Sequence, residues 1–298
     1  MKVDTMRNVD RWAGIPLTFL FSIFLWLYEK IFLKKQKNPD IRRTLFIELS
    51  EMGSAILVDP AMRKLRKNAN AGLFFGIFTN NYKSLKILET IPEDHIFRMR
   101  SDNLFILGLD VLKFMAWCRQ KKITAIIDLE LFSRFTALLS GLSGARSRVG
   151  FSTFHDEGMY RGTIINFPVR YNPHVHISIN FMSLVNRALG FFDTPYATEP
   201  VFPDEIRLEK ARIRQEDVAV VRQKIRNLYP AYDDEKIVLI NVNASDLLPQ
   251  RRWLPENFEN TGRTILETYD NVLIVATGAP IERDYVEKVV AGINHARC

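Results

Sequence analysis

Apolar and polar residues follow two repeating patterns along most of this 298-residue chain. Short apolar runs, typical of buried strands, are separated by longer segments whose apolar residues recur at helical spacing. The runs predict strands at residues 44–48, 72–78, 95–99, 125–129, 237–242 and 272–277, and the spacing predicts helices at 54–67, 104–121, 134–142, 174–189, 215–229, 255–268 and 281–294. Such alternation predicts an α/β fold with parallel sheets that are covered on both faces.

Two interruptions in this pattern indicate how the chain is divided. Residues 149–172 are less regular, and the proline-containing residues 193–203 are typical of an interdomain linker. We therefore expect an apolar and basic segment with its linker at 1–43, a Rossmann-like domain at 44–192 and a second domain at 204–298. The second domain has only two clear strands, too few for a stable parallel core, so we expect the sequence to be incomplete at its C-terminal end.

The longest apolar run lies near the N-terminus. Residues 12–28 carry no charge, and their 17 residues reach the lower limit for a bilayer-spanning helix. No small-residue cleavage site of a signal peptide follows. Trp12, Trp26 and Tyr28 suit a membrane interface, and the lysines that follow suit anionic headgroups. We expect residues 12–37 to associate with a membrane, either spanning it or lying flat; a helix buried against the first domain is the alternative.

The charge of the chain is concentrated at the same end. Residues 1–43 hold nine Lys and Arg against four Asp and Glu, whereas the whole chain has a net charge of +7. The remaining chain is nearly balanced, so we expect no nucleic-acid partner. Cys118 and Cys298 form neither a disulfide framework nor a metal-ligand spacing, so we expect a reducing compartment and no metal site.

The first candidate site follows the first predicted strand, at the edge where open α/β sheets hold their ligands. Gly53 permits a close backbone approach, and Ser54 can cap a helix or donate to a phosphate. Glu48 and Glu51 are candidate bases. Ordinary strand–turn–helix chemistry is the simpler interpretation of this segment.

Two further polar groups are less specific. Asp128 and Glu130, at another strand end, fit either a metal ion or the capping of the next helix. His155, Asp156 and Tyr160 lie close together in the less regular region, where they fit either acceptor binding or a solvated loop.

The most specific candidate site follows the strand at 237–242. Asn243 and Ser245 offer an amide and a hydroxyl, and Arg251 and Arg252 offer guanidinium groups just before a predicted helix. Backbone N–H groups, a hydroxyl and a guanidinium can converge there on one phosphate. This arrangement predicts a nucleotide-linked ligand, with an ordinary surface loop as the alternative.

Taken together, these segments resemble glycosyltransferase family 9, the ADP-heptose:lipopolysaccharide heptosyltransferases. Ser50-Glu51-Met52-Gly53-Ser54 is similar to the S-x-x-G-D turn of the family. Arg251-Arg252-Trp253-Leu254-Pro255 is similar to its K-R-W-P block, and Thr277-Gly278-Ala279-Pro280 looks like its turn after the next strand.

The resemblance implies a GT-B architecture, in which two Rossmann-like domains with parallel sheets face across a cleft. It also implies a bacterial, inverting, metal-independent glycosyltransferase with no cofactor. Such an enzyme moves a sugar, for example heptose from ADP-heptose, to lipopolysaccharide or another lipid-linked cell-surface glycan at the cytoplasmic face of the inner membrane. Ser245 and Arg251 match the family's phosphate contacts, and Gly53 matches its backbone approach.

The chain departs from the family at two places. Ser54 stands where the family has its catalytic Asp, so Glu51 is the nearest substitute base, with Glu48 and Asp156 as alternatives. The D-S-G-P-x-H block of the family is absent, and we expect it beyond residue 298. A non-catalytic, membrane-associated protein that binds a sugar nucleotide or glycan is therefore the second interpretation. A nicotinamide-dependent enzyme is disfavoured because the chain lacks a Gly-rich dinucleotide fingerprint.

Overall fold

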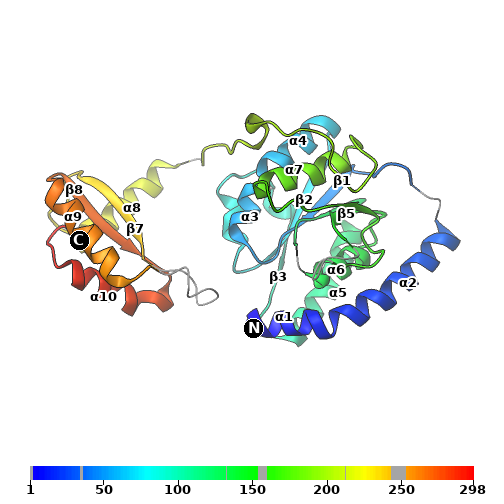
Figure 1. The fold of residues 1–298 in the computed structure, drawn as a ribbon, viewed down its shortest axis with the longest axis horizontal. Helices are drawn as coiled ribbons and strands as arrows, with labels where there is room; N and C mark the ends of the chain where they lie inside the picture. The colour runs from blue at the N-terminus through cyan, green and yellow to red at the C-terminus, as the bar shows by residue number, and fades with distance from the viewer. Residues whose placement is uncertain (1–2, 34–35, 132, 154–159, 212, 243–252) are drawn as a thin grey trace. The chain divides into compact units, whose positions relative to one another are not determined.

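The computed structural model describes residues 3–33, 36–131, 133–153, 160–211, 213–242 and 253–298. It divides into two compact units, Met1–Arg212 and Ile213–Cys298 (Figure 1). The expected linker at 193–203 ends earlier than this boundary. The residues that follow it stay on the first unit, because Lys64 pairs with Glu205 and Arg63 with Glu209, each at 2.6 Å.

The first unit is built on a six-stranded parallel sheet in the order β3-β2-β1-β4-β5-β6. Its strands are β1 (Arg43–Ile47), β2 (Gly72–Phe78), β3 (Ile96–Met99), β4 (Ala125–Asp128), β5 (Ser147–Phe151) and β6 (Phe167–Val169). This is the doubly wound order: the chain adds β2 and β3 on one side of β1, and then returns to add β4, β5 and β6 on its other side. The order of strands therefore reverses between β1 and β4. Ligands of such folds bind at the carboxyl ends of the strands beside this reversal.

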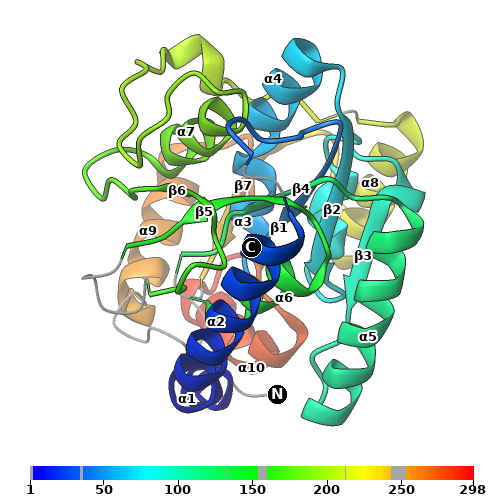
Figure 2. The same ribbon diagram turned by 90° about the vertical axis from the view of Figure 1, so that its right-hand side faces the viewer.

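Helices cover both faces of this sheet (Figure 2). In the cores, α3, α4 and α7 pack on one face, whereas α5 and α6 pack on the other. The helical elements of the unit are α1 (Val3–Trp12), α2 (Gly14–Phe32), α3 (Met52–Leu57), α4 (Asp59–Ala69), η1 (Tyr82–Lys86), η2 (Glu93–His95), α5 (Leu104–Gln120), α6 (Arg134–Leu142), α7 (Ile177–Ala188) and η3 (Pro203–Ile206). Phe46 and Phe75 point to the first face, and their neighbours Leu45 and Phe74 to the second, so both faces of the sheet are buried.

The region expected to be irregular, 149–172, contains most of β5 and all of β6. Sequence patterning missed them because β5 includes Arg148 and Gly150, and β6 is a three-residue strand that includes Pro168. Arg148 is nevertheless buried, since its guanidinium donates to the carbonyls of Ile164 at 2.6 Å and Ala145 at 2.8 Å. A buried arginine whose donors are satisfied can occupy a central strand.

The second unit is small. It contains α8 (Gln215–Leu228), β7 (Lys236–Asn241), α9 (Pro255–Thr268), β8 (Val272–Thr277), η5 (Pro280–Glu282) and α10 (Arg283–Ile293). In its described part, β7 and β8 form a two-stranded parallel sheet, as the sequence predicts. Leu266, Ile274 and Val289 form a core on one side of these strands, and Ile225 and Leu273 pack on the other.

Helix α2 lies against α6 and against the segment before β6. It is the one described helix that is long and apolar enough, by length and composition, to cross a membrane. Small residues allow its close approach, because Gly14, Thr18 and Ser22 are buried on the side that faces the unit. Opposite them, Gly162 has a φ of +57°, and a Cβ placed there would lie 1.9 Å from the Ser22 hydroxyl oxygen.

We expect Gly162→Ala to separate α2 from the first unit. Alanine would be strained at a positive φ, by about 1–2 kcal/mol, and would also collide with Ser22. Gly144→Ala is the matched control, because Gly144 has a φ of +80° but open space around the added methyl group. Urea denaturation should show a loss of unfolding free energy about 1–3 kcal/mol larger for Gly162→Ala than for the control. Equal losses would contradict this packing.

Candidate functional site

The carboxyl ends of β1 and β4 bring three acidic residues together at the point of strand-order reversal. Ile47 pairs with Asp128 in the register of these two strands, so Glu48 follows β1 where Asp128 ends β4. Glu130 lies two residues further on, and its backbone N–H donates to the Asp128 carboxylate at 3.1 Å. We call Glu48, Asp128 and Glu130 the strand-end carboxylates. Two of the strand ends predicted from sequence therefore form one site.

Glu130 holds the turn that follows β1. Its Oε1 atom accepts hydrogen bonds from the backbone N–H groups of Leu49 and Ser50, each at 3.0 Å, and from the Ser50 hydroxyl at 2.8 Å. From the turn after β2, the Asn81 amide donates to the carbonyls of Leu49 at 2.8 Å and Ser50 at 2.9 Å. Sequence reasoning missed Asn81, for which a polar residue shortly after a strand was the only signal. Three strand ends thus position one turn.

Glu48 is the most strongly perturbed carboxyl group of the site. Its side chain is almost fully buried, and burial, followed by the negative charges of Glu130 and Glu51, raises its pKa well above the ordinary value. A hydrogen bond between the side chains of Glu48 and Glu130 acts in the same direction. Glu48 therefore holds its proton to a higher pH than an ordinary glutamate does, which suits a structural donor better than a base.

Asp128 pairs with Arg161 in the interior of the first unit. The Arg161 Nη1 atom lies 2.6 Å from Asp128 Oδ2, and both side chains are fully buried. Burial raises the pKa of Asp128 to about 6, although the charge of Arg161 acts in the opposite direction. The Nη2 atom of Arg161 donates to the Glu130 carbonyl. Arg161 thus connects the segment before β6 to the strand-end carboxylates, a pairing that no local sequence pattern indicates.

Glu51 and Ser54 meet at the start of α3. Glu51 is the exposed N-cap residue of α3, and its Oε2 atom accepts a hydrogen bond from the Ser54 hydroxyl at 2.8 Å. The Ser54 side chain is otherwise buried. Between them, Gly53 is exposed, and a Cβ added there would meet nothing within 4 Å, so no described residue requires glycine at this position. The Glu51 carboxylate is therefore an accessible acceptor beside the position of the family's aspartate.

The structure describes only some of the other residues that were predicted to form a site. Asn243, Ser245, Arg251 and Arg252 lie outside the described residues, as do His155 and Asp156. Tyr160 is described and partly buried, directly before Arg161. The predicted helix after the Arg-Arg-Trp block is confirmed, since α9 begins at Pro255. Among the described residues, no group of three or more Asp, Glu, His or Cys is placed to hold a metal ion.

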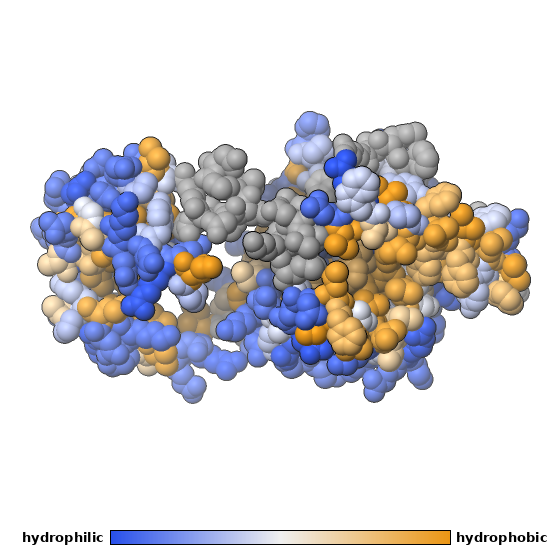
Figure 3. All heavy atoms as spheres, turned by 90° about the horizontal axis from the view of Figure 1, so that it is seen from below, coloured by the Kyte–Doolittle hydropathy of each residue, from blue (hydrophilic) through white to orange (hydrophobic). Residues whose placement is uncertain are grey.

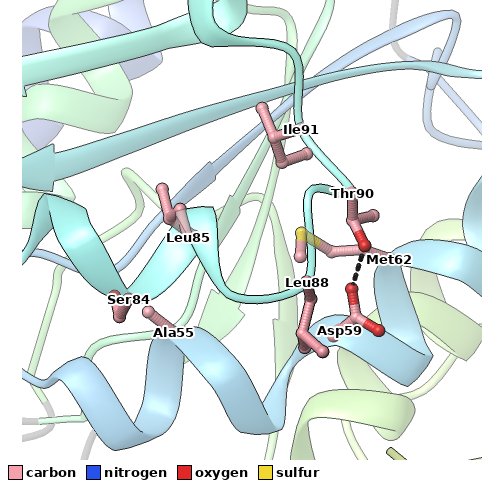
Figure 4. Close-up of a pocket in the computed structure, with 8 residues that line it drawn as sticks. All are labelled: Ala55, Asp59, Met62, Ser84, Leu85, Leu88, Thr90 and Ile91. Carbon is pink, nitrogen blue, oxygen red and sulfur yellow. Dashed lines mark hydrogen bonds between the residues drawn. The ribbon is translucent and has the colours of Figure 1, made fainter. Parts of the chain in front are cut away.

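A small cavity between α3, α4 and the chain after η1 is too small to be a ligand site (Figure 4). Its volume is about 10 Å³, room for one water molecule. Asp59 at its rim accepts hydrogen bonds from Thr90 and from Arg63, the latter at 2.8 Å. The candidate site is therefore the strand-end carboxylates with the turn that carries Glu51.

Comparison with known proteins agrees with this architecture. No protein-family model matches the chain, and no curated protein sequence matches it. A solved glycosyltransferase family 9 structure from Veillonella parvula is 17% identical, with a TM-score of 0.62, over 86% of this chain and 67% of that one.

The E. coli heptosyltransferase WaaC with ADP is 15% identical, with a TM-score of 0.58, over 84% of this chain and 72% of that one. The structure of the same enzyme with ADP-2-deoxy-2-fluoro heptose is 15% identical, with a TM-score of 0.55, over 85% of this chain and 74% of that one. At these identities the likeness concerns the fold. The expected GT-B-like α/β fold of the family 9 kind, with a small second sheet, is confirmed.

We expect Glu48→Gln to change how stability depends on pH. Because the native state raises the pKa of Glu48, it binds this proton more tightly than the unfolded chain, so the free energy of unfolding falls as the pH rises from about 4 through the raised pKa. Glutamine mimics the protonated acid and removes this loss. As the pH rises from about 4 to 8, urea denaturation should show that the free energy of unfolding of the variant increases, relative to that of the unsubstituted protein, by about 1 kcal/mol or more.

Asp110→Asn is the control of opposite sign. A hydrogen bond from Arg100 lowers the pKa of Asp110, so its contribution is present above the ordinary aspartate range and lost as the pH falls. This variant should be less stable than the unsubstituted protein at neutral pH, and the difference in free energy of unfolding should shrink in acid. A constant difference for Glu48→Gln across the range would contradict the proton assignment.

Proposed function

We propose that this protein is a glycosyltransferase that uses a nucleotide-sugar donor, with inversion and without a metal ion or cofactor. The observation that carries the proposal is the fold match to family 9 structures over 84–86% of the chain. The S-x-x-G turn that follows β1, which resembles the family's motif, supports it. Two of these structures hold ADP or an ADP-heptose analogue, which favours an ADP-linked sugar such as heptose as the donor.

Glu51 is the base in this proposal. Its exposed carboxylate removes the proton of an acceptor hydroxyl, and the acceptor oxygen attacks C1 of the donor sugar from the face opposite the leaving group. The bond from C1 to the diphosphate oxygen breaks, and the nucleoside diphosphate leaves with the electron pair. Glu48 fits this role less well, because it is buried and its pKa is raised. Ser54 holds Glu51 through its hydroxyl group.

The donor diphosphate is assigned to the residues after β7. Asn243, Ser245, Arg251 and Arg252 lie between the end of β7 at Asn241 and the start of α9 at Pro255. A segment that joins a parallel strand to a helix offers backbone N–H groups to a phosphate, and arginine offers two parallel donors. Positive charge there would stabilise the leaving diphosphate.

The acceptor in this proposal is a lipopolysaccharide or another lipid-linked glycan of a bacterial cell envelope. His155, Asp156 and Tyr160 are its candidate contacts on the first unit. The apolar helix α2 supports an acceptor that is held in a membrane, with the enzyme on the cytoplasmic face of the inner membrane.

A non-catalytic protein that binds a sugar nucleotide or glycan is the second candidate function. Ser54 favours it, because a serine hydroxyl is a far weaker base than the aspartate that the family has at this position. In this alternative, the same fold binds the donor while no sugar is transferred.

Glu51→Gln should lower the rate of sugar transfer by at least about 100-fold, since a positioned general base contributes 10²–10⁴-fold. Donor affinity should stay unchanged. Ser54→Asp, combined with Glu51→Gln, should restore part of the activity, because it places a carboxylate where the family has one. Transfer from ADP-sugars is measured by ADP release. Full activity of Glu51→Gln would exclude Glu51 as the base, and donor binding without turnover in the unsubstituted protein would favour the non-catalytic alternative.

Arg251→Ala should weaken ADP binding by about 10- to 100-fold, the size of one lost charge-assisted hydrogen bond. Arg283→Ala is the matched control, because Arg283 is an exposed arginine of the same unit that pairs with Glu287 one helical turn away. Isothermal titration calorimetry with ADP measures both. Equal affinities of the two variants would refute the phosphate assignment.

A further inference from the structure

Helix α2 has the reverse of the polarity expected for a helix packed on a soluble domain. Such a helix buries its bulky apolar residues and exposes its polar ones. The buried residues on the side of α2 that faces the first unit are instead the small Gly14, Thr18 and Ser22 with Leu25, and the partly buried Phe21 lies beside Leu25 against Gly141. The rest of the helix surface exposes bulky apolar residues: Ile15, Leu17, Phe19, Leu20, Ile23, Phe24, Trp26, Leu27, Ile31 and Phe32.

The first unit holds α2 near both ends. Before α2 begins, the Asp10 carboxylate accepts from the backbone N–H groups of Arg134 at 2.8 Å and Phe135 at 2.9 Å, and so caps α6. Asp10 also pairs with the Arg134 guanidinium at 3.2 Å. Near the end of α2, Glu29 lies 2.5 Å from a guanidinium nitrogen of Arg148, whose side chain is only 3% exposed.

The middle of α2 is held as well. The Ser22 hydroxyl accepts a hydrogen bond from the backbone N–H of Thr163 at 3.1 Å, and the Thr163 hydroxyl donates to the Ser22 carbonyl at 3.3 Å. A helix of this length extends over about 28 Å, and its attachments are spread along it. Crossing a bilayer would break them and leave the buried guanidinium groups of Arg134 and Arg148 without their carboxylates. Lying in the membrane plane keeps every one of them.

The exposed side of α2 fits an anionic bilayer. Trp26 and Tyr28 are exposed on α2, and Trp12 is exposed at the end of α1; such residues favour the lipid headgroup region. Residues 1–43 hold nine Lys and Arg against four Asp and Glu, which favours anionic lipid. Helix α5, on the same face of the sheet as α6, also exposes large apolar residues: Leu104, Phe105, Leu109 and Leu112. Figure 3, viewed from the side where α1, α2 and α5 lie, shows apolar residues gathered over this part of the first unit.

A hollow beside α2 adds room for a hydrocarbon chain. It has a volume of about 360 Å³ and is walled by Phe19, Ile23 and Trp26 of α2 and by Tyr160 and Thr163. Tyr160 directly precedes Arg161, which binds Asp128 among the strand-end carboxylates. The apolar surface therefore begins close to the candidate site.

We propose that α2 is an in-plane anchor that binds an anionic lipid bilayer through its exposed apolar side while its small-residue side stays packed on α6. Asp10 ties α1 to the start of α6, four residues after Glu130, so the anchored protein presents the strand-end carboxylates near the lipid headgroups. This proposal goes beyond the assignment as a glycosyltransferase. It concerns lipid binding alone and stands whether or not the protein transfers a sugar.

Vesicle flotation tests whether the binding partner is an anionic lipid bilayer. The full chain should float with vesicles of phosphatidylcholine and phosphatidylglycerol and less with phosphatidylcholine alone. The double variant Leu20→Glu/Phe24→Glu should bind at least tenfold more weakly, because both side chains are more than half exposed and point away from the unit. Ile281→Glu, at an 89% exposed position of the second unit, is the control that should bind normally. Thermal melting confirms that the variants are folded.

Depth measurement tests the orientation. One exposed cysteine at a time is introduced by Leu17→Cys, Leu20→Cys, Phe24→Cys or Ile31→Cys in a Cys298→Ser background, in which the remaining Cys118 is buried. Each is labelled with a fluorophore that lipid-borne quenchers reach. An in-plane helix should place all four labels at a similar shallow depth, about 5–10 Å into the headgroup and acyl boundary. Labels 20 and 24 near the bilayer centre, with 17 and 31 nearer its surfaces, would overturn the proposal in favour of a span.

The same variants distinguish a protein partner. If the unsubstituted protein does not bind either vesicle and forms an oligomer that Leu20→Glu/Phe24→Glu dissociates in analytical ultracentrifugation, the apolar side is an interface between copies of the chain. Absence of both vesicle binding and self-association would equally overturn the proposal.

Discussion

A carboxylate that is taken out of water needs hydrogen-bond donors, and this requirement shapes the carboxyl end of the first sheet. Glu130 obtains its donors from the turn after β1, and Asp128 obtains them from Arg161. Burial and the neighbouring carboxylates instead raise the pKa of Glu48. The contacts of Glu130 join residues about 80 positions apart, so the turn that presents Glu51 is fixed by a neighbouring strand. The accessible carboxylate of Glu51 thus depends on the strand-end carboxylates, of which Glu48 and Asp128 are buried.

Elements with unbroken apolar patterns were predictable from sequence alone. The bounds of β2, β8, α6 and α9 agree with the expectation, because their apolar residues recur without interruption between clear turn residues. The helix expected at 54–67 is two helices, α3 and α4, since the chain turns at Val58 before Asp59 and Pro60. Strands β5 and β6 were missed because tertiary contacts of Arg148, and not local apolarity, make them suitable for burial.

Some features of the candidate site were also predictable from sequence, and others were not. The meeting of Glu51 and Ser54 follows from their spacing at a helix start, which local pattern reveals. The contact of Glu48 with Glu130, the pairing of Asp128 with Arg161 and the hydrogen bonds of Asn81 depend on which strands are neighbours. A single sequence does not state this. Ser245 and Arg251, outside the described residues, remain predictions from the motif.

The small-residue side of α2 has a consequence for how this protein can be handled. An apolar N-terminal helix is commonly removed to obtain a soluble enzyme. Here, removal would delete the cap of α6 and the carboxylates that neutralise Arg134 and Arg148, and would uncover Gly141, which α2 now covers. The truncated protein would lose its exposed apolar surface together with contacts of its interior. Preparation of the intact domain therefore calls for detergent or lipid nanodiscs in place of truncation.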